Sequence, residues 1–197
     1  MVFFEYYIVF VLSIFIFVKK YYSNSYNLYF SGDATCGTDY SVASSSITIL
    51  SGSTTGTTII SLTDDSVYEG NETAIVAITS ITSAGSATED GTQSETITIT
   101  ENDSVGSFSV ADVSDGEGSD DEATITVSLS TASSTSTTID YATSNGTATA
   151  GSDYTATNGT LTFAAGETSK TFTVSITDDN IDENSETVTI TISNASA

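Results

Sequence analysis

The stretch Thr187-Val-Thr-Ile-Thr-Ile192 alternates threonine with a branched apolar residue. Successive side chains of a β-strand point to opposite faces of its sheet, so this pattern is typical of a strand with one buried face. The same alternation recurs along the chain from about residue 44, and glycine-containing turns separate the runs. Many short strands at regular spacing predict an all-β fold, an antiparallel β-sandwich. The other alternating runs are 46–50, 57–62, 73–81, 96–100, 124–129, 161–163 and 170–176.

The chain contains one structural unit twice, at an offset of 114 residues: Gly37-Thr-Asp-Tyr40 recurs as Gly151-Ser-Asp-Tyr154. A fixed period of this kind indicates repeated structure. The acidic residues keep the register while the residues between them differ, which makes the acids the best lead to function. The matching acids are Asp39 and Asp153, Asp64 and Asp178, Asp65 and Asp179, Glu69 and Glu183, and Glu72 and Glu186.

Acidic residues dominate the charge of the chain. It has 26 Asp and Glu against three Lys and Arg, so its net charge is −23. Lys19 and Lys20 lie near the N-terminus, and Lys170 is the one basic residue of the sequence from Ser31 onward. Such a chain repels polyanions, so we expect no nucleic-acid partner, and it attracts cations.

The sequence lacks the residues that common catalytic chemistry uses. It has no histidine, which removes the usual general base and the usual zinc ligand. Its one cysteine, Cys36, has no second cysteine to pair with in this chain and no histidine to activate it. We therefore expect that the protein is not an enzyme and has no catalytic residues.

In the second unit the acids gather in alternate connections between the expected strands. Alternate connections of an antiparallel up-and-down course lie at the same pole, which places 11 of the 14 acids of residues 105–197 together. Gathered carboxylates repel, and a divalent cation relieves this. Calcium takes about six to eight oxygen ligands and accepts carboxylates from flexible loops, which favours it over magnesium. The alternative is a solvated acidic rim, because Asp is common in turns for its backbone bonding alone.

The N-terminal 18 residues are apolar apart from Glu5 and Ser13, and Lys19-Lys20 ends the run. The uninterrupted part, 6–18, is shorter than the roughly 20 residues of a membrane-spanning helix. We interpret residues 1–20 as a signal segment or a single membrane anchor, helical in conformation, and residues 21–31 as a linker. A buried apolar strand pair is the alternative.

Longer motifs give the chain a family resemblance. Residues 105–197 contain Phe108-Ser-Val110, Ile139-Asp-Tyr-Ala-Thr-Ser-Asn-Gly-Thr-Ala-Thr-Ala-Gly-Ser-Asp-Tyr154 and Gly159-Thr-Leu-Thr-Phe-Ala-Ala-Gly-Glu167, then Ile176-Thr-Asp-Asp179. In these motifs the sequence closely resembles the Calx-β domain, and residues 32–103 resemble it more weakly. The resemblance implies seven-stranded, immunoglobulin-like β-sandwiches. It implies a partial repeat at 32–104, without its first two strands and most of the third, and a repeat at 105–197 that lacks its last strand.

The resemblance also implies a set of calcium ligands, drawn from the loops at one pole of each sandwich. In the second repeat the matching positions are Glu117, Asp153, Asp178, Asp179, Glu183 and Glu186. In the first repeat they are Asp39, Asp64, Asp65, Glu69 and Glu72, with Glu101 and Asp103 after its last strand.

From these patterns we expect calcium-binding structural or adhesive repeats of a surface or secreted protein. The expected location is extracellular or at the cell surface, and the expected partners are calcium ions and neighbouring repeats or another surface protein. The alternative is a calcium-sensing regulatory region of a membrane transporter of the sodium–calcium exchanger type.

Overall fold

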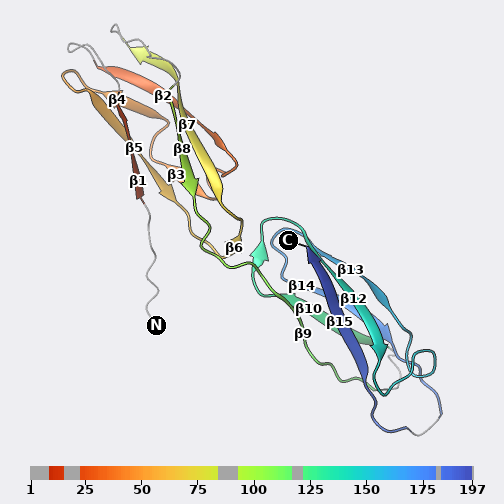
Figure 1. Cartoon of the computed structure of the whole chain (residues 1–197). Coiled ribbons are helices and arrows are strands. Elements are labelled where there is room, and N and C mark those ends of the chain that lie inside the picture. Colours follow the sequence, from red (N-terminus) through yellow and green to blue (C-terminus); the bar gives the residue numbers. More distant parts are fainter. Residues whose placement is uncertain (1–8, 16–22, 84–92, 117–121, 181–182, 197) are drawn as a thin grey trace, which may run out of the picture. The chain divides into compact units, whose positions relative to one another are not determined.

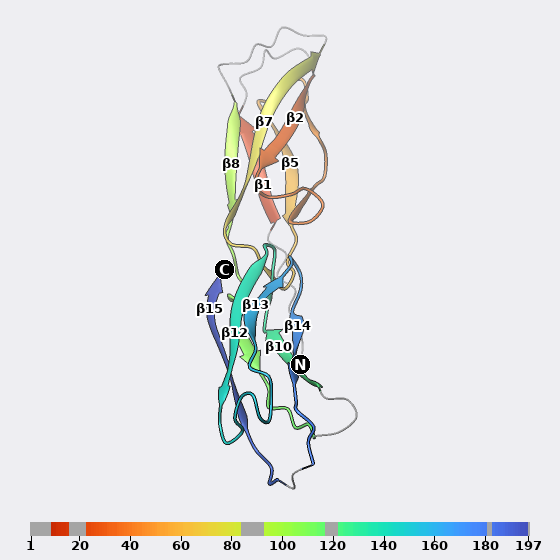
Figure 2. The ribbon, with the colours of Figure 1, turned by 90° about the vertical axis from the view of Figure 1, so that its right-hand side faces the viewer.

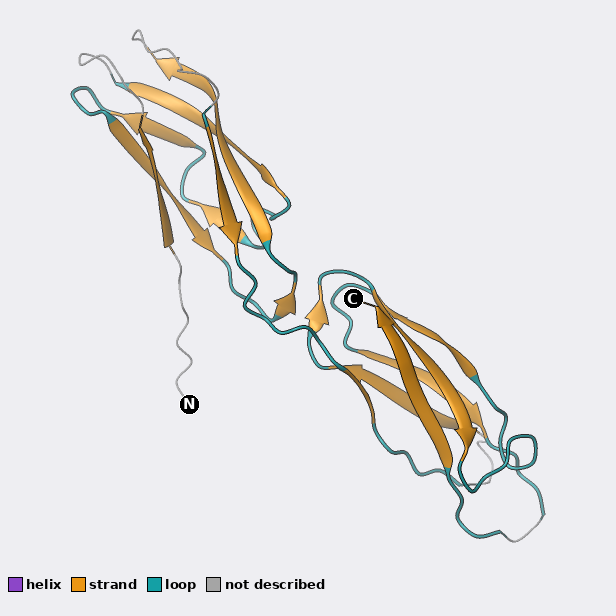
Figure 3. Ribbon diagram, viewed as in Figure 1, coloured by secondary structure: helices purple, strands orange, loops and turns teal. Residues whose placement is uncertain are grey.

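The part of the chain that the structure describes consists of β-strands and loops (Figure 1, Figure 3). A computed structural model describes residues 9–15, 23–83, 93–116, 122–180 and 183–196. The chain divides into two compact units, one of Met1–Asp65 with Gly70–Glu101 and one of Ser66–Glu69 with Asn102–Ala197. A search of these described residues finds no helix long and apolar enough to cross a membrane.

The first unit is built from two antiparallel sheets, of three and four strands. Their inner faces enclose a core that includes the fully buried Tyr26, Ile49, Ile60 and Val76. The three-stranded sheet has the order β1 (Val9–Phe15), β5 (Thr55–Leu62), β3 (Tyr40–Val42). The four-stranded sheet has the order β4 (Ser46–Ile49), β2 (Asn24–Gly32), β7 (Glu72–Ser83), β8 (Ser94–Ile99).

The second unit has two antiparallel sheets of three strands each. A short parallel pair is added by β11 (Ala132–Ser133) and β6 (Val67–Tyr68), which lies in the 66–69 segment of this unit. One sheet has the order β14 (Ser169–Ser175), β10 (Glu122–Leu129), β9 (Phe108–Val110). The other has the order β13 (Asn158–Phe163), β12 (Thr137–Asn145), β15 (Val188–Ser196) (Figure 2).

Aromatic rings join the two sheets of the second unit. Phe108 on β9 meets Phe163 on β13 edge-to-face, with ring centroids 5.2 Å apart. Tyr141 on β12 stacks on Phe172 of β14 at 3.9 Å. Because the apolar residues of each strand alternate with exposed threonines and serines, the strands bury one face, and the expected β-sandwich is confirmed.

Two expectations for the N-terminal region are wrong. Val9–Phe15 form strand β1, which pairs along its whole length with β5, and not a helix. Asn24–Gly32 form strand β2 in the middle of the four-stranded sheet, and not a linker. The reason is visible in β2, where Asn24, Tyr26 and Leu28 alternate as buried residues. The first unit is therefore more complete than its resemblance to the family implied.

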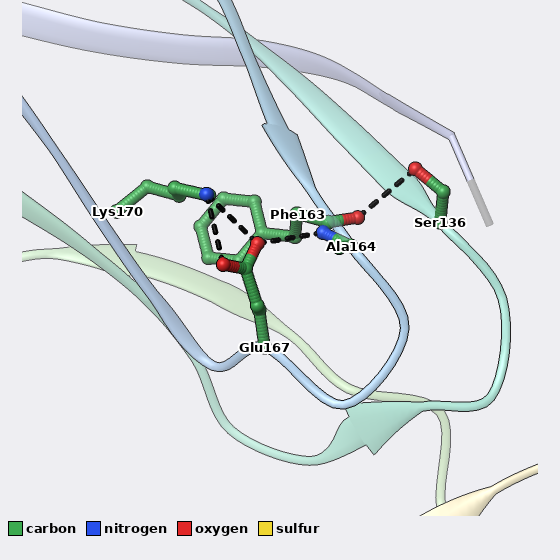
Figure 4. Close-up of polar contacts among 5 residues, drawn as sticks. All are labelled: Ser136, Phe163, Ala164, Glu167 and Lys170. Atoms are coloured by element: carbon green, nitrogen blue, oxygen red, sulfur yellow. Dashed lines mark hydrogen bonds and ion pairs between the residues drawn. The ribbon is translucent and has the colours of Figure 1, made fainter.

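The basic residue Lys170, near the start of β14, lies beside the turn between β13 and β14 (Figure 4). Glu167 accepts a hydrogen bond from the backbone N of Ala164 at 2.7 Å and forms an ion pair with Lys170 at 2.8 Å. The hydroxyl of Ser136 donates to the carbonyl of Phe163 beside it at 3.0 Å. Lys170 and the Ala164 amide together lower the pKa of Glu167. The ionised carboxylate of Glu167 therefore bonds to Ala164 on one side of this turn and to Lys170 on the other.

We expect Phe163→Ala to destabilise the second unit by about 3–5 kcal/mol, because Phe163 is fully buried and its removal leaves a cavity. The free energy of unfolding, measured by urea denaturation, tests this. Val113→Ala is the control: Val113 is 49% exposed, and its loss should cost about 0.5 kcal/mol or less. Equal effects of the two substitutions would contradict the assignment of Phe163 to the core.

We expect Glu167→Gln to lower the melting temperature at neutral pH but not in acid. The pKa of Glu167 is lowered by folding, so its contribution is present above the unfolded value of about 4.3 and is lost as pH falls through the folded value. Melting curves of both proteins between about pH 2 and pH 7 should converge at the acid end. In a matched experiment, Lys170→Met should raise the Glu167 pKa followed by carboxyl NMR. An unchanged titration would contradict the role of Lys170.

Candidate metal centre

Asp153 lies in a tight turn that its own side chain helps to form. Its Oδ2 accepts a hydrogen bond from the backbone N of Thr149 at 2.7 Å, and its backbone N donates to the carbonyl of Thr149 at 3.0 Å. Gly151 has a φ of +93°, which explains the glycine, because other residues are strained in that conformation. The turn fixes the position of the Asp153 carboxylate relative to the backbone.

The next residue, Tyr154, anchors this turn in the core. Tyr154 is 2% exposed, and its hydroxyl donates to Asn145 Oδ1 at 2.8 Å. Two backbone hydrogen bonds attach the turn to the end of β14, from Thr155 N to Ser175 O and from Thr177 N to Asp153 O, both at 2.9 Å. The loop after β14 therefore begins directly beside Asp153, although the two segments are more than twenty residues apart in sequence.

Three carboxylates converge at this end of the second unit, where the β12–β13 and β14–β15 loops lie (Figure 1). Asp153, Glu183 and Glu186 each offer an oxygen, and these oxygens all lie within 4.8 Å of one another. Asp153 is half-buried and the two glutamates are exposed. Two oxygens bound to one calcium ion at about 2.3–2.6 Å lie at most about 5 Å apart, so the spacing suits a single ion.

The first unit repeats the turn. Asp39 Oδ2 accepts from the backbone N of Thr35 at 2.5 Å, and its carbonyl accepts from Thr63 N at 2.8 Å. Gly37 has a φ of +100°, close to the +93° of Gly151 in the second unit. Burial raises the pKa of Tyr40, the residue after Asp39, and electrostatic interactions with Cys36 and Asp39 raise it further. A second group of three carboxylates, Asp39, Glu69 and Glu72, meets the same distance limit. Each of its members lies 114 residues before a member of the group that contains Asp153.

The tandem aspartates after β5 and β14 are exposed and lie outside both groups of three. Glu101 accepts a hydrogen bond from Gly70 N at 2.6 Å through its Oε2, and Asn71 Oδ1 accepts from Glu101 N at 2.9 Å. Asp103 is half-buried, and Glu117 lies outside the described residues. Among the described residues, the structure therefore brings together six of the predicted ligands in two groups and leaves six outside them: Asp64, Asp65, Asp178, Asp179, Glu101 and Asp103.

Sequence analysis missed the residues that hold the last glutamate of each group. Asp33 Oδ1 accepts hydrogen bonds from Thr73 N at 2.6 Å and Thr73 Oγ1 at 2.5 Å, directly after Glu72, and these bonds lower the Asp33 pKa. The counterpart of Asp33 in the second unit is Thr147, whose Oγ1 accepts from Thr187 N at 2.8 Å, directly after Glu186. The 114-residue offset pairs Asp33 with Thr147. Because one is an acid and the other carries a hydroxyl, the sequence does not show that both accept a hydrogen bond from the residue after the last glutamate.

The chain matches a known family over most of its length. A model of the Calx-beta domain matches residues 18–104 and 101–197, and the protein belongs to the Calx-beta domain family. The first match begins at residue 18 and therefore includes β2. The resemblance to this family found in the sequence is confirmed. No curated protein matches the chain.

Solved structures with similar folds include Calx domains. "Crystal structure of Apo-form Calx CBD1 domain" is 31% identical, and the match covers 39% of this chain and 68% of that one with a TM-score of 0.38. "Crystal structure of CBD12 from CALX1.2" is 22% identical over 95% of this chain and 74% of that one, with a TM-score of 0.43. "Crystal structure of calcium binding domain CBD12 of CALX1.1" is 21% identical with the same coverage and TM-score.

We expect Gly151→Ala to destabilise the second unit by about 1 kcal/mol or more, because alanine is strained at this positive φ. The control is Gly116→Ala, since nothing lies within 4 Å of an added Cβ there and its φ is not in the positive range that strains other residues. That change should be neutral or stabilising by up to about 1 kcal/mol, through the lower entropy of the unfolded chain. Chemical denaturation measures both, and equal stabilities would contradict the geometry of the turn.

Proposed function

We propose that the two Calx-beta domains bind calcium and act as structural or adhesive modules of a surface or secreted protein. The observation that supports this most strongly is the meeting of Asp153, Glu183 and Glu186 within 4.8 Å, in a turn and loop from different parts of one compact unit. One of the similar solved structures has a title that names a calcium binding domain. The donor chemistry agrees, because calcium prefers carboxylate and carbonyl oxygens.

Calcium would act on the protein by joining loops that otherwise repel. Three carboxylates held close together repel one another, and a doubly charged ion neutralises most of their charge. The ligands come from the β12–β13 loop and from the loop before β15. A bound ion would therefore join these two loops and stiffen this pole. That is a structural role, and it requires no catalytic residue.

Affinity separates the two candidate roles. Extracellular modules bind calcium with dissociation constants of about 10⁻⁴–10⁻³ M, whereas sensors work at about 10⁻⁷–10⁻⁵ M. The regulatory region of a membrane transporter is the second candidate, and it rests on the match to the Calx-beta domain family. Both glutamates of the second-unit group are exposed, which favours weak calcium binding with a dissociation constant in the range of extracellular modules. We propose an extracellular or cell-surface location on the same ground.

We expect calorimetric titration of the chelator-treated full chain with calcium to release or absorb heat and to raise the melting temperature. At a hundredfold excess over the dissociation constant, bound calcium stabilises the folded state by about 2.7 kcal/mol. Asp153→Asn combined with Glu183→Gln should weaken the second-unit site by about tenfold or more, because two charged ligands are lost. Glu167→Gln removes a charge from a turn outside the group of three and should leave the calcium affinity unchanged.

If millimolar calcium produces no heat and no rise in the melting temperature, the domains do not bind calcium and the proposal is overturned. A micromolar or tighter dissociation constant would favour the regulatory alternative. Surface labelling of cells that express the full chain tests the location separately.

A further inference from the structure

Asn145, the last residue of β12, holds both ends of the turn that carries Asp153 through a single side-chain oxygen. Its Oδ1 accepts a hydrogen bond from the backbone N of Ala150 at 3.0 Å and another from the hydroxyl of Tyr154 at 2.8 Å. Ala150 and Tyr154 also pair with each other as an isolated bridge. A carbonyl oxygen has two lone pairs, so Asn145 Oδ1 uses its whole accepting capacity on this turn.

The turn is attached to the other sheet of the unit as well. Thr155 N donates to Ser175 O at the end of β14, and β14 and β12 belong to different sheets. The hydrogen bonds within the turn close it on itself and attach it to neither sheet. Asn145 therefore supplies a side-chain attachment to the sheet of β12, and the Asp153 carboxylate is held between the two sheets.

The β12–β13 loop also fixes the backbone beside Glu186. Thr147 N donates to Thr187 Oγ1 at 3.2 Å, and Thr187 N donates to Thr147 Oγ1 at 2.8 Å. Ala148 N adds a hydrogen bond to Thr187 O at 3.2 Å. Two of the three carboxylates of the group, Asp153 and Glu186, therefore depend on the conformation of this one loop.

The first unit holds its equivalent turn without such a side chain. The 114-residue offset aligns Asn145 with Ser31 and Tyr154 with Tyr40. Among the residues that the structure describes, no hydrogen bond joins the side chain of Ser31 to Tyr40, whose ring contacts that of Phe30 at 6.3 Å. The attachment through Asn145 is therefore particular to the second unit.

We propose that Asn145 is a positioning residue of the second-unit metal centre and acts through Ala150 and Tyr154 to hold Asp153 in place for calcium. An amide suits this position because it accepts two hydrogen bonds and adds no negative charge beside three carboxylates. This role rests on the calcium binding proposed for the group of three carboxylates. It concerns the second unit alone, because the first unit has serine at the equivalent position.

The test measures calcium binding by calorimetry in the full chain with Asp39→Asn and Glu72→Gln, which disable the first-unit group and leave the second. In this background, Asn145→Ala should raise the dissociation constant about fivefold or more, because two hydrogen bonds that orient the turn are lost. Asn145→Asp keeps an acceptor oxygen at the same reach. It should return the dissociation constant to the background value or below, because its added charge also attracts the cation.

Asn158→Ala is the matched control. Asn158 is exposed and precedes Gly-Thr, as Asn145 does, but its side chain has no hydrogen bond to any residue that the structure describes. Its loss should change the dissociation constant by less than about twofold. Tyr154→Phe removes the Tyr154–Asn145 bond from the other side, so combining it with Asn145→Ala should weaken binding little beyond Asn145→Ala alone.

Amide hydrogen exchange without calcium gives a readout that needs no metal. The Ala150 amide should exchange faster in Asn145→Ala than in the background chain, and Asn145→Asp should restore its protection. A lowered melting temperature with unchanged calcium affinity in Asn145→Ala would show a purely structural role and overturn the proposal, as would failure of Asn145→Asp to restore binding. If the background chain itself binds no calcium, the calcium proposal fails, and the exchange of Ala150 alone decides whether Asn145 holds the turn.

Discussion

The hydrogen bond from Thr177 N to Asp153 O is the constraint on which the candidate metal centre depends. It fixes the start of the loop after β14 against the turn that carries Asp153. Without this bond, the loop containing Glu183 and Glu186 could lie in many places, because nothing in its own sequence directs it toward Asp153. The first unit has the equivalent bond, from Thr63 N to Asp39 O. The arrangement is therefore a feature of the repeated fold and occurs in both copies.

Charge and packing act in opposite directions in this protein. The two cores and the antiparallel ladders hold each sandwich together, while the acids repel one another. The fold concentrates part of that repulsion in two small groups of carboxylates, where a cation can relieve it most effectively. The stability of the loops at that pole is thus coupled to the ionic composition of the surroundings, while the cores are not.

Much of the fold could be predicted from the sequence, because strands with one buried face alternate visibly, as at 187–192 and 170–176. Strand β1 could not, since an uninterrupted apolar run looks the same in a membrane segment and in a buried strand. The acids that the 114-residue offset pairs include Asp39 and Asp153 and the glutamates that the structure brings to them. The offset did not exclude Asp178 and Asp179 from the groups, because side-chain direction beyond the end of a strand depends on the loop. It also gave no signal for Asp33, whose counterpart Thr147 is not acidic.

The two copies use different chemistry to hold the strand that follows their last glutamate. A carboxylate, Asp33, holds Thr73 in the first copy, and a hydroxyl, Thr147, holds Thr187 in the second. The lowered pKa of Asp33 means that its carboxylate stays ionised to a lower pH than an ordinary aspartate, and that its hydrogen bonds weaken as pH falls through the lowered value. The threonine has no such transition. At equivalent positions, the duplicated sandwich therefore has one hydrogen bond that depends on the ionisation of a carboxylate and one that does not.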